Sequence, residues 1–202
     1  MLMRSSLSAD RGYSLVELVV ALSILGVLLA AAVPSAVDWM RDLRVRGVAE
    51  SLKTGLEKAR MEALKSNRNI SFWLVDDPSN KVPGASCVLS ASGRGWVVSV
   101  ADPTGACNAA ASTTAAPMLA YRSDAVMDAG QVTAEAVDAA GTGATRVTFN
   151  ALGQVTGAGA IRRIDVKRNA GGGRTLRVMV DPGGGIRTCD RGVSAGDPRA
   201  CP

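Results

Sequence analysis

The sequence contains no histidine, and only 3% of its 202 residues are aromatic. Without histidine the chain has neither a Ser-His-Asp nor a Cys-His catalytic arrangement, and it has no imidazole ligands for zinc. The glycine triplet at 183–185 is not followed by the Lys-Ser/Thr pair of a phosphate-binding loop. The carboxylates are scattered along the chain. We therefore expect a protein that is not an enzyme and that needs no cofactor or metal.

An uncharged apolar segment lies near the N-terminus, behind a short polar leader at residues 1–12. Residues 18–37 carry no charged side chain, and about 20 apolar residues are what a helix needs to cross a bilayer. A buried core helix is one alternative. A Sec signal peptide is another, with the alanines at 30–32 as its small-residue cleavage site. Glu17 argues against the signal peptide, because a carboxylate in the membrane is costly unless it has a partner.

Residues 12–18 read Gly-Tyr-Ser-Leu-Val-Glu-Leu and resemble the class III signal of type IV pilins and type II secretion pseudopilins. The resemblance implies that a prepilin peptidase cleaves after Gly12, methylates the new N-terminus at Tyr13 and leaves the apolar helix in place. In a filament, Glu17 would neutralise the Tyr13 amine of a neighbouring subunit. Because an unpaired buried charge costs about 3–5 kcal/mol, Glu17 would set the register of insertion. The other interpretation is a carboxylate that reaches the membrane interface.

The helical pattern continues beyond Pro34, which should bend the helix because proline removes a backbone hydrogen bond. Apolar residues then recur mostly at spacings of three and four, as in a helix that packs one face on a globular domain. We expect one long helix over residues 13–66, with 13–37 in the membrane or filament core and an amphipathic half at 38–66. The apolar stripe consists of Val37, Met40, Val45, Val48, Leu52, Leu56, Ala59 and Ala63.

From residue 67 to residue 202 the sequence predicts a β-rich domain. Its apolar segments are short and are mostly bounded by Gly, Pro, Asn or Asp, which is typical of an antiparallel β fold. Residues 101–145 contain 15 alanines, and we expect irregular loops with short strands there. The glycines at 171–173 predict a flexible hairpin loop. The expected strands are 70–75, 95–100, 118–122, 131–134, 145–150, 161–167, 175–180 and 186–189.

The four cysteines are Cys87, Cys107, Cys189 and Cys201, and none belongs to a CxxC pair. An exported domain lies in an oxidising compartment, where disulfides persist. Of the three connectivities we favour the local pairs Cys87–Cys107 and Cys189–Cys201, each of which would stabilise the fold by about 3 kcal/mol. Pairing across the two sets and a four-cysteine zinc site stay open.

Three segments of the β domain resemble the GspH/FimT subfamily of pilins. They are Gly-Arg-Gly-Trp-Val-Val at 93–98, Phe-Asn-Ala-Leu-Gly-Gln-Val at 149–155, and Gly-Gly-Ile-Arg-Thr-Cys-Asp at 184–190 with the tail that ends at Cys201. Trp96 is most simply a core aromatic residue, and Gly153 is most simply a turn residue. The resemblance implies an α+β fold, the pilin-like lollipop, in which a long N-terminal helix packs on an antiparallel β domain.

The resemblance also implies a function. The protein would be a minor pilin or pseudopilin that helps to prime a type IV pilus or a type II secretion pseudopilus; the sequence does not decide between the two. Its partners would be other pilins through the N-terminal helix, the prepilin peptidase, the inner-membrane assembly platform and inner-membrane lipid before assembly. It would span the bacterial inner membrane once, with its C-terminal domain in the periplasm, before it enters the filament. A soluble secreted protein with a Sec signal is the alternative.

Positive charge is concentrated in the last third of the chain. Residues 141–202 carry ten Lys or Arg and four Asp or Glu, whereas residues 1–140 have a net charge of −1. A basic cluster can bind a phosphate backbone, and some FimT members are DNA receptors with a Gly-Arg-x-Arg motif. The corresponding stretch here, residues 184–187, keeps only the second arginine. DNA binding is therefore one interpretation, and a solvated face or a contact with acidic filament neighbours is the other. The candidate DNA contacts are Arg162, Arg163, Lys167, Arg168, Arg187 and Arg191.

Overall fold

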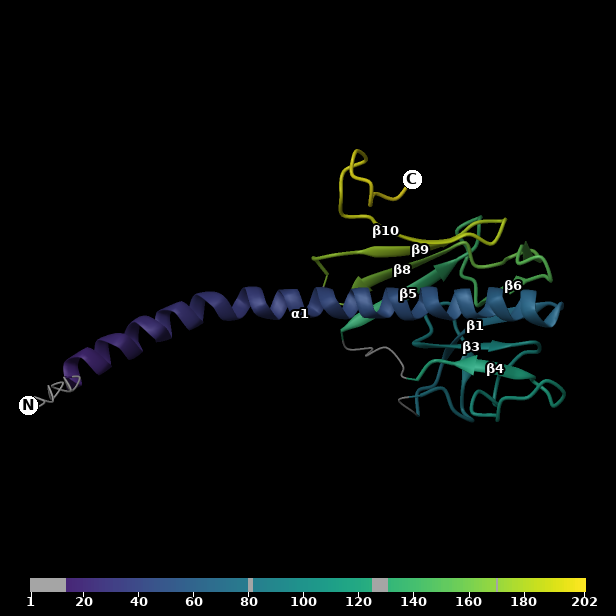
Figure 1. Ribbon diagram of the computed structural model, residues 1–202, viewed down its shortest axis with the longest axis horizontal. Coiled ribbons are helices and arrows are strands. Elements are labelled where there is room, and N and C mark those ends of the chain that lie inside the picture. The colour runs from purple at the N-terminus through teal and green to yellow at the C-terminus, as the bar shows by residue number, and fades with distance from the viewer. Residues whose placement is uncertain (1–13, 80–81, 125–130, 170) are drawn as a thin grey trace, which may run out of the picture. The chain divides into compact units, whose positions relative to one another are not determined.

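The computed structural model of the protein describes residues 14–79, 82–124, 131–169 and 171–202, with the backbone alone described at residues 31–36 (Figure 1). The chain divides into two compact units, of which the first ends at Met40 and the second runs from Arg41 to Pro202. The helix α1 (Leu15–Ser66) contributes to both units, and the described strands all belong to the second. The expected leader and its cleavage site, Gly12 and Tyr13, lie outside the described residues.

The long helix expected from the sequence is confirmed, and both of its ends have local causes. The backbone N–H of Glu17 donates to the Oγ of Ser14 at 3.2 Å, so Ser14 is the N-cap and Glu17 occupies the third helical position, as in a capping box. After Ser66, Asn67 adopts a φ of 51°, a left-handed conformation that asparagine tolerates at helix ends. Residue 34 lies inside α1. The bend expected at Pro34 stays a prediction.

Within the second unit, one face of α1 is buried in the core. The buried residues follow one another at steps of four and three, which keeps them on a single stripe of the helix. The predicted stripe differs at Val48, which is only partly buried at the edge of the core where Ala49 is buried, and at Met40, which is 48% exposed. The buried stripe consists of Val45, Ala49, Leu52, Leu56, Ala59 and Ala63.

The strands form two antiparallel sheets. Sheet A has the order β4-β3-β1-β6-β7, with β2 paired to β1, and sheet B has the order β10-β9-β8-β5. The strands of sheet A are β1 (Ile70–Asp76), β2 (Val88–Leu89), β3 (Gly95–Ser99), β4 (Leu119–Arg122), β6 (Arg146–Phe149) and β7 (Val155–Thr156). Those of sheet B are β5 (Val132–Val137), β8 (Arg163–Arg168), β9 (Leu176–Val180) and β10 (Ile186–Asp190).

The eight strands expected from the sequence are therefore all present. The additional strands β2 and β7 have two residues each, too few to show a hydrophobic period in the sequence. The alanine-rich region contains β4 and β5 between irregular segments, as expected, although residues 125–130 lie outside the described part. The glycines at 171–173 all have positive φ and lie between β8 and β9, which pair as a hairpin.

Sheet A is covered by apolar residues on both faces. On one face Phe72 and Leu74 of β1 join the core formed by α1 and sheet B. On the other face Trp73 and Val75 of the same strand join a second cluster, which includes the Cys87–Cys107 disulfide. This two-sided burial explains why the sequence of β1 lacks the alternation of a half-exposed strand.

Trp96 of β3 joins α1 to sheet A. Its ring centroid lies 6.1 Å from that of Phe72, and its Nε1 donates to the Oγ of Ser51 on α1 at 3.1 Å. A Cβ atom on Gly55 would lie 2.7 Å from the Trp96 ring and 2.8 Å from the Phe72 ring. The absence of a side chain at Gly55 therefore allows the helix to pack closely on the two rings, and Trp96, only 5% exposed, is a core residue.

Gly55→Ala should destabilise the domain, because the added methyl group forces the two rings to move, at a cost of about 1–3 kcal/mol. The intrinsic preference of alanine for helices, about 1 kcal/mol over glycine, offsets only part of this loss. Gly47→Ala is the matched control, since a Cβ there meets nothing within 4 Å, and it should stabilise the protein. Urea unfolding of the full-length protein in detergent, followed by tryptophan fluorescence, measures both. Equal stabilisation by the two variants would contradict the close contact.

Candidate functional site

The described part of the first unit presents an apolar helix surface. Residues 14–30 are all exposed, and Glu17 is the one charged residue among them. Exposed apolar surfaces of this extent normally mark a contact with protein or membrane. Eleven of its large apolar side chains are at least half exposed: Leu15, Val16, Leu18, Val19, Val20, Leu22, Ile24, Leu25, Val27, Leu28 and Leu29.

Only part of the expected N-terminal signal lies within the described residues. Ser14 and Glu17 lie in the first turn of α1 and at its cap, whereas Gly12 and Tyr13 fall outside. Within the described residues, no helical stretch combines the length and the hydropathy that crossing a bilayer requires.

Sheet B distributes the basic residues of the last third over its two faces. Arg163 and Arg187 are both register partners of Met179, so they lie in one row on the face that points away from the core. We call this face, with Arg163, Asp165, Lys167, Arg177, Met179 and Arg187, the outer face of sheet B. Arg168 follows Lys167 in β8 and therefore projects to the opposite face. The structure thus brings Arg163, Lys167 and Arg187 together and separates Arg168 from them.

Acidic side chains pair with much of the positive charge on the outer face. Arg177 donates to both carboxylate oxygens of Asp165, at 2.7 and 2.8 Å. Arg191 approaches the same carboxylate at 3.4 Å, and Lys167 forms an ion pair with Glu135 at 3.0 Å. Among the described residues, the side chains of Arg163 and Arg187 have no ion pair or hydrogen bond. These two arginines are the positive charges on this face that remain available to a ligand.

The Asp165 carboxyl should make stability depend on pH. Burial raises the pKa of this carboxyl. The hydrogen bond from Arg177 and the positive charges of Arg177, Arg191 and Arg163 lower it by a larger amount, so the pKa of Asp165 lies below its ordinary value. The unfolded chain then takes up this proton first as the pH falls. The contribution of Asp165 to stability is therefore complete above about pH 4 and is lost as the pH falls through the lower pKa of the folded state.

We expect the free energy of unfolding to decrease from about pH 4 downward, and to decrease by less in Asp165→Asn, which has no carboxyl to titrate there. Urea unfolding of both proteins at about pH 5 and pH 3 measures the difference. An identical decrease in the two proteins would show that the ion pairs of Asp165 do not contribute to the pH dependence of the free energy of unfolding.

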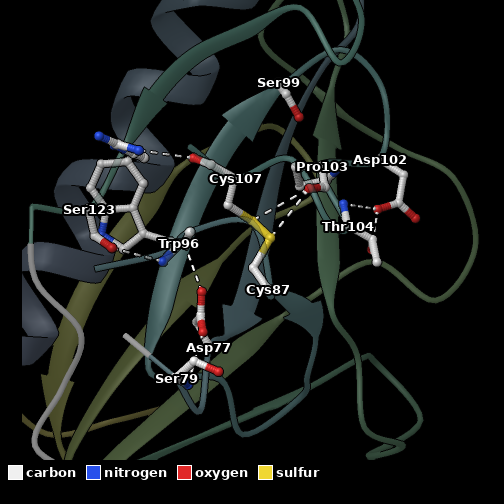
Figure 2. The surroundings of a disulfide bond; sticks show 12 residues. Asp77, Ser79, Cys87, Trp96, Ser99, Asp102, Pro103, Thr104, Cys107 and Ser123 are labelled. Carbon is white, nitrogen blue, oxygen red and sulfur yellow. Dashed lines mark hydrogen bonds between the residues drawn. A yellow bond between two sulfur atoms is a disulfide. The ribbon is translucent and has the colours of Figure 1, made fainter. Parts of the chain in front are cut away.

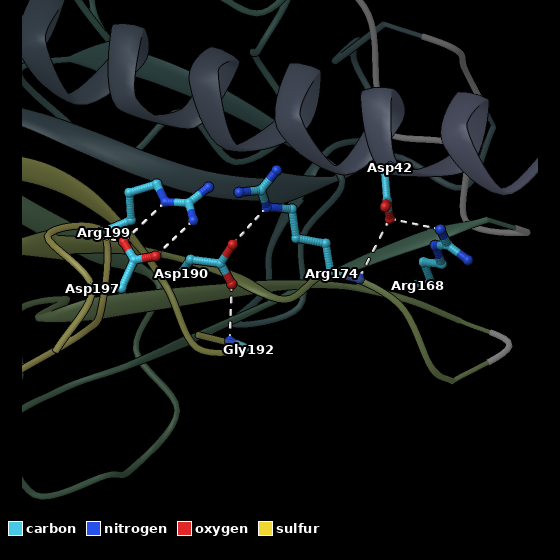
Figure 3. Close-up of polar contacts among 7 residues, drawn as sticks. All are labelled: Asp42, Arg168, Arg174, Asp190, Gly192, Asp197 and Arg199. Atoms are coloured by element: carbon cyan, nitrogen blue, oxygen red, sulfur yellow. Dashed lines mark hydrogen bonds and ion pairs between the residues drawn. The ribbon is translucent and has the colours of Figure 1, made fainter. Parts of the chain in front are cut away.

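On the core side of sheet B, a polar network joins the second-unit part of α1 to the β8–β9 hairpin (Figure 3). Asp42 accepts a hydrogen bond from Arg168 at 2.6 Å and one from the backbone N–H of Arg174 at 3.4 Å. The Nε of Arg174 in turn donates to Asp190 at 2.6 Å, and the N–H of Gly192 donates to the same carboxylate at 2.9 Å. Arg168, which the sequence analysis offered as a DNA contact, is thus only 10% exposed and is held by Asp42.

The C-terminal tail returns to β10 and is fixed there by a disulfide. Cys189 and Cys201 are bonded, with their Cα atoms 5.0 Å apart, and the N–H of Asp190 donates to the carbonyl of Arg199 at 2.7 Å. Arg199 also donates to both oxygens of Asp197. This pairing lowers the pKa of Asp197 to about 2. The tail therefore forms a closed loop on the last strand.

The other disulfide fixes the loops that cover sheet A (Figure 2). Cys87 and Cys107 are bonded and almost completely buried. The loop ahead of Cys87 is organised by the buried Asp77, whose carboxylate accepts hydrogen bonds from the backbone N–H groups of Ser79 and Gly84 at 3.0 and 2.8 Å. Both disulfides join the local pairs favoured from the sequence. No free cysteine remains for a four-cysteine zinc site, and the described residues contain no cluster of His, Cys, Asp or Glu suited to a metal.

Two turns that the sequence analysis singled out meet against α1. Gly153, after β6, and Gly184, before β10, have φ values of 72° and 82°. A Cβ atom on Gly184 would overlap the carbonyl oxygen of Gly153. The Nε of Arg60 on α1 donates to that same oxygen at 3.2 Å. The first glycine of the 184–187 stretch is thus required by the packing of the two turns.

Three features of these sites were not predicted from the sequence: the N-cap of α1, the separation of Lys167 from Arg168, and the role of Asp42. The Ser-x-x-Glu pattern at 14–17 would have identified the N-cap of α1. The strand alternation of β8 would have separated Lys167 from Arg168. Asp42 gave no local signal, because its partner Arg168 lies 126 residues further along the chain.

A long N-terminal helix that packs on two antiparallel sheets, next to an exposed apolar segment with a single carboxylate, defines a pilin-like α+β protein. The family model described as type II transport protein GspH matches residues 48–184. The chain therefore belongs to the GspH family, as its motifs indicated. A model of the prokaryotic N-terminal methylation motif matches residues 7–33.

Among solved structures, the chain is similar to the type IV minor pilin FimU of Pseudomonas aeruginosa in two crystal forms, with 20% sequence identity to each. The similarity to the P21 form covers 74% of this chain and 90% of that chain, with a TM-score of 0.46. The similarity to the P65 form covers 71% and 90%, with a TM-score of 0.42. A comparison with curated proteins found no match.

Proposed function

We propose that the protein is a minor subunit of a type IV pilus or of a type II secretion pseudopilus. Residues 13–37 would hold it in the inner membrane at first and would then pack among like helices in the filament. The observation that carries this proposal is the exposed apolar surface of residues 15–30, which lipid and neighbouring helices would cover in turn. The methylation motif at 7–33 agrees with such a role. The β domain would lie in the periplasm, where both disulfides persist.

Processing at the N-terminus tests this proposal directly. A prepilin peptidase would cleave after Gly12 and methylate Tyr13, whereas a signal peptidase would cleave near residue 33. N-terminal sequencing and mass spectrometry of the protein purified from membranes distinguish the two. A chain that begins with methylated Tyr13 supports the pilin role. A chain that begins near residue 33 supports the secreted protein and overturns the pilin role.

Glu17→Gln and Glu17→Ala should lower the incorporation of the subunit into filaments by about tenfold or more. The reason is that the positive amine of Tyr13 would lose its partner in apolar surroundings, at a cost of about 3–5 kcal/mol. The ratio of protein in sheared filaments to protein in membranes, measured by immunoblot, reports incorporation. The β domain should unfold at the same urea concentration as in the wild type.

Ser14→Ala is the matched control for this experiment. It removes the hydrogen bond to the N–H of Glu17, at a typical cost of about 1 kcal/mol, but it leaves the carboxylate in place. A loss of incorporation as large as that of Glu17→Gln would assign the effect to helix capping and not to charge. Normal assembly of Glu17→Gln would count against the register role.

Binding of duplex DNA by the outer face of sheet B is a second candidate function. The observation that favours it is the row formed by Arg163 and Arg187, whose side chains form no ion pair or hydrogen bond among the described residues. An electrophoretic shift of the full-length protein in detergent, at two salt concentrations, is the test, because phosphate contacts weaken as salt rises. Arg163→Gln/Arg187→Gln should abolish a shift that Arg199→Gln retains, since Arg199 is paired with Asp197. No shift at low salt would eliminate this candidate.

A further inference from the structure

A cleft of about 470 Å³ lies between the C-terminal end of α1 and strand β4. Glu62 and Lys65 of α1 line one side, and Tyr121 of β4 lines the other. Arg68, just after the helix, and Ser112 and Thr113, in the loop before β4, complete its polar lining. The cleft belongs to the second unit alone and is separate from both the exposed helix of the first unit and the outer face of sheet B.

Arg68 is a cation without a suitable acceptor. Its Nη1 donates to the Sδ of Met118 at 3.6 Å, and a thioether is only a weak acceptor. Its Nε is buried and has no hydrogen-bond partner among the described residues. A guanidinium keeps its charge and offers five N–H donors in a planar fork that matches a carboxylate. The buried Nε is closed to any ligand, but the Nη groups have only this thioether as an acceptor among the described residues, so the cleft lacks a stronger acceptor that they could bind.

The other charges of the cleft compensate one another and define the charge of the missing group. Lys65 approaches Glu62 at 3.7 Å. Lys65 also lies in the last turn of α1, where a positive charge complements the helix dipole. Arg68 is therefore the one uncompensated charge among the three, and it would be balanced by a single negative charge. A carboxylate meets this requirement, whereas a phosphate dianion would leave an excess of negative charge.

We propose that this cleft binds the carboxylate of an Asp or Glu side chain from a partner polypeptide. Arg68 would form the charged hydrogen bonds, and the hydroxyl groups of Ser112 and Tyr121 would supply further donors. Met118 also lines the cleft and, being only partly buried, would contact the methylene groups of the bound side chain. Met118 has a φ of 54°, a backbone conformation that is uncommon and costly for a non-glycine residue. This inference goes beyond the filament role and does not rest on it.

The methyl group of Met118 provides a probe inside the cleft. The full-length protein in detergent would be labelled with [13C]methyl-methionine, and the Met118 signal would be assigned with Met118→Leu. The ligands are an acetylated five-residue peptide with a central Glu, the same peptide with Gln, and acetate. We expect the Glu peptide to shift the Met118 signal with a Kd in the millimolar range, as is usual for so small a contact. The Gln peptide and acetate should bind about tenfold more weakly or not at all.

Three variants make the assignment to Arg68 specific. Arg68→Gln should weaken binding of the Glu peptide by about tenfold or more. Arg187→Gln, an equivalent change on the outer face of sheet B, should leave binding unchanged. Arg68→Glu should reverse the charge preference, so that a peptide with a central Lys binds and the Glu peptide does not. Unchanged signals of the other methionines would show that the variants are folded. An unmoved Met118 signal, equal binding of the Glu and Gln peptides, or undiminished binding to Arg68→Gln would overturn the proposal. Equal binding of acetate and the Glu peptide would overturn the polypeptide as the source of the carboxylate.

Discussion

Gly184→Ala is expected to destabilise the β domain by about 2–5 kcal/mol. A φ of 82° costs a residue with a Cβ about 1–2 kcal/mol. In addition, the Cβ would overlap the carbonyl oxygen of Gly153, and relieving such an overlap typically costs about 1–3 kcal/mol. The oxygen has little freedom to move, because it accepts the hydrogen bond from Arg60 of α1. Urea unfolding of the full-length protein in detergent, followed by tryptophan fluorescence, measures the loss.

The neighbouring Gly183 provides the control for this prediction. A Cβ at residue 183 would meet nothing within 4 Å, and the residue has no left-handed φ. Gly183→Ala should therefore change the free energy of unfolding by no more than about 0.5 kcal/mol. Similar stabilities of the two variants would show that the turns of Gly153 and Gly184 do not pack as described.

Asp190→Ala is expected to cost about 3–5 kcal/mol of stability, which is the usual result when one partner of a buried ion pair is removed. The side chain of Asp190 is 5% exposed, and that of its partner Arg174 is 18% exposed. Its loss would leave the guanidinium of Arg174 without this carboxylate and would remove the acceptor of the Gly192 N–H. The same change would loosen the start of the C-terminal tail. Denaturant unfolding gives the size of the effect.

Asp197→Ala tests whether burial is the cause. Asp197 and Arg199 also approach to 2.6 Å, but their side chains are 23% and 63% exposed. Because water screens exposed ion pairs, this variant should lose much less stability than Asp190→Ala. If the two aspartate variants lose the same amount, distance and not burial determines the contribution of these pairs.

The elements of this fold could largely be predicted from the sequence, because each depends on local patterns. The spacing of apolar residues gave the helix up to residue 66, and short apolar segments between turn residues gave eight strands. The local disulfides agreed with the proximity of their cysteines along the chain. The two-residue strands β2 and β7 were missed, because they are created by pairing with β1 and β6 and have no pattern of their own.

The candidate surfaces were less predictable, because they depend on contacts between distant residues. The excess of positive charge after residue 140 was visible, but the sequence did not show that Arg168 turns toward Asp42 while Arg163 and Arg187 share a row. The unsatisfied guanidinium of Arg68 was equally hidden, since its neighbour Met118 is 50 residues away. Composition therefore indicates how much charge a domain carries, but only the register of its strands shows which charges remain free.

The burial of sheet A on both faces has a consequence for how the domain opens. Strand β1 pairs with β2, β3 and β6, and its residues 70–75 are all buried. Amide hydrogens in such a strand cannot reach solvent through a local fluctuation, because neither face nor edge can be exposed without disrupting both apolar clusters. Their exchange with deuterium would therefore proceed only through complete unfolding. The amides of Phe72–Val75 would thus report the global stability of the domain without any added denaturant.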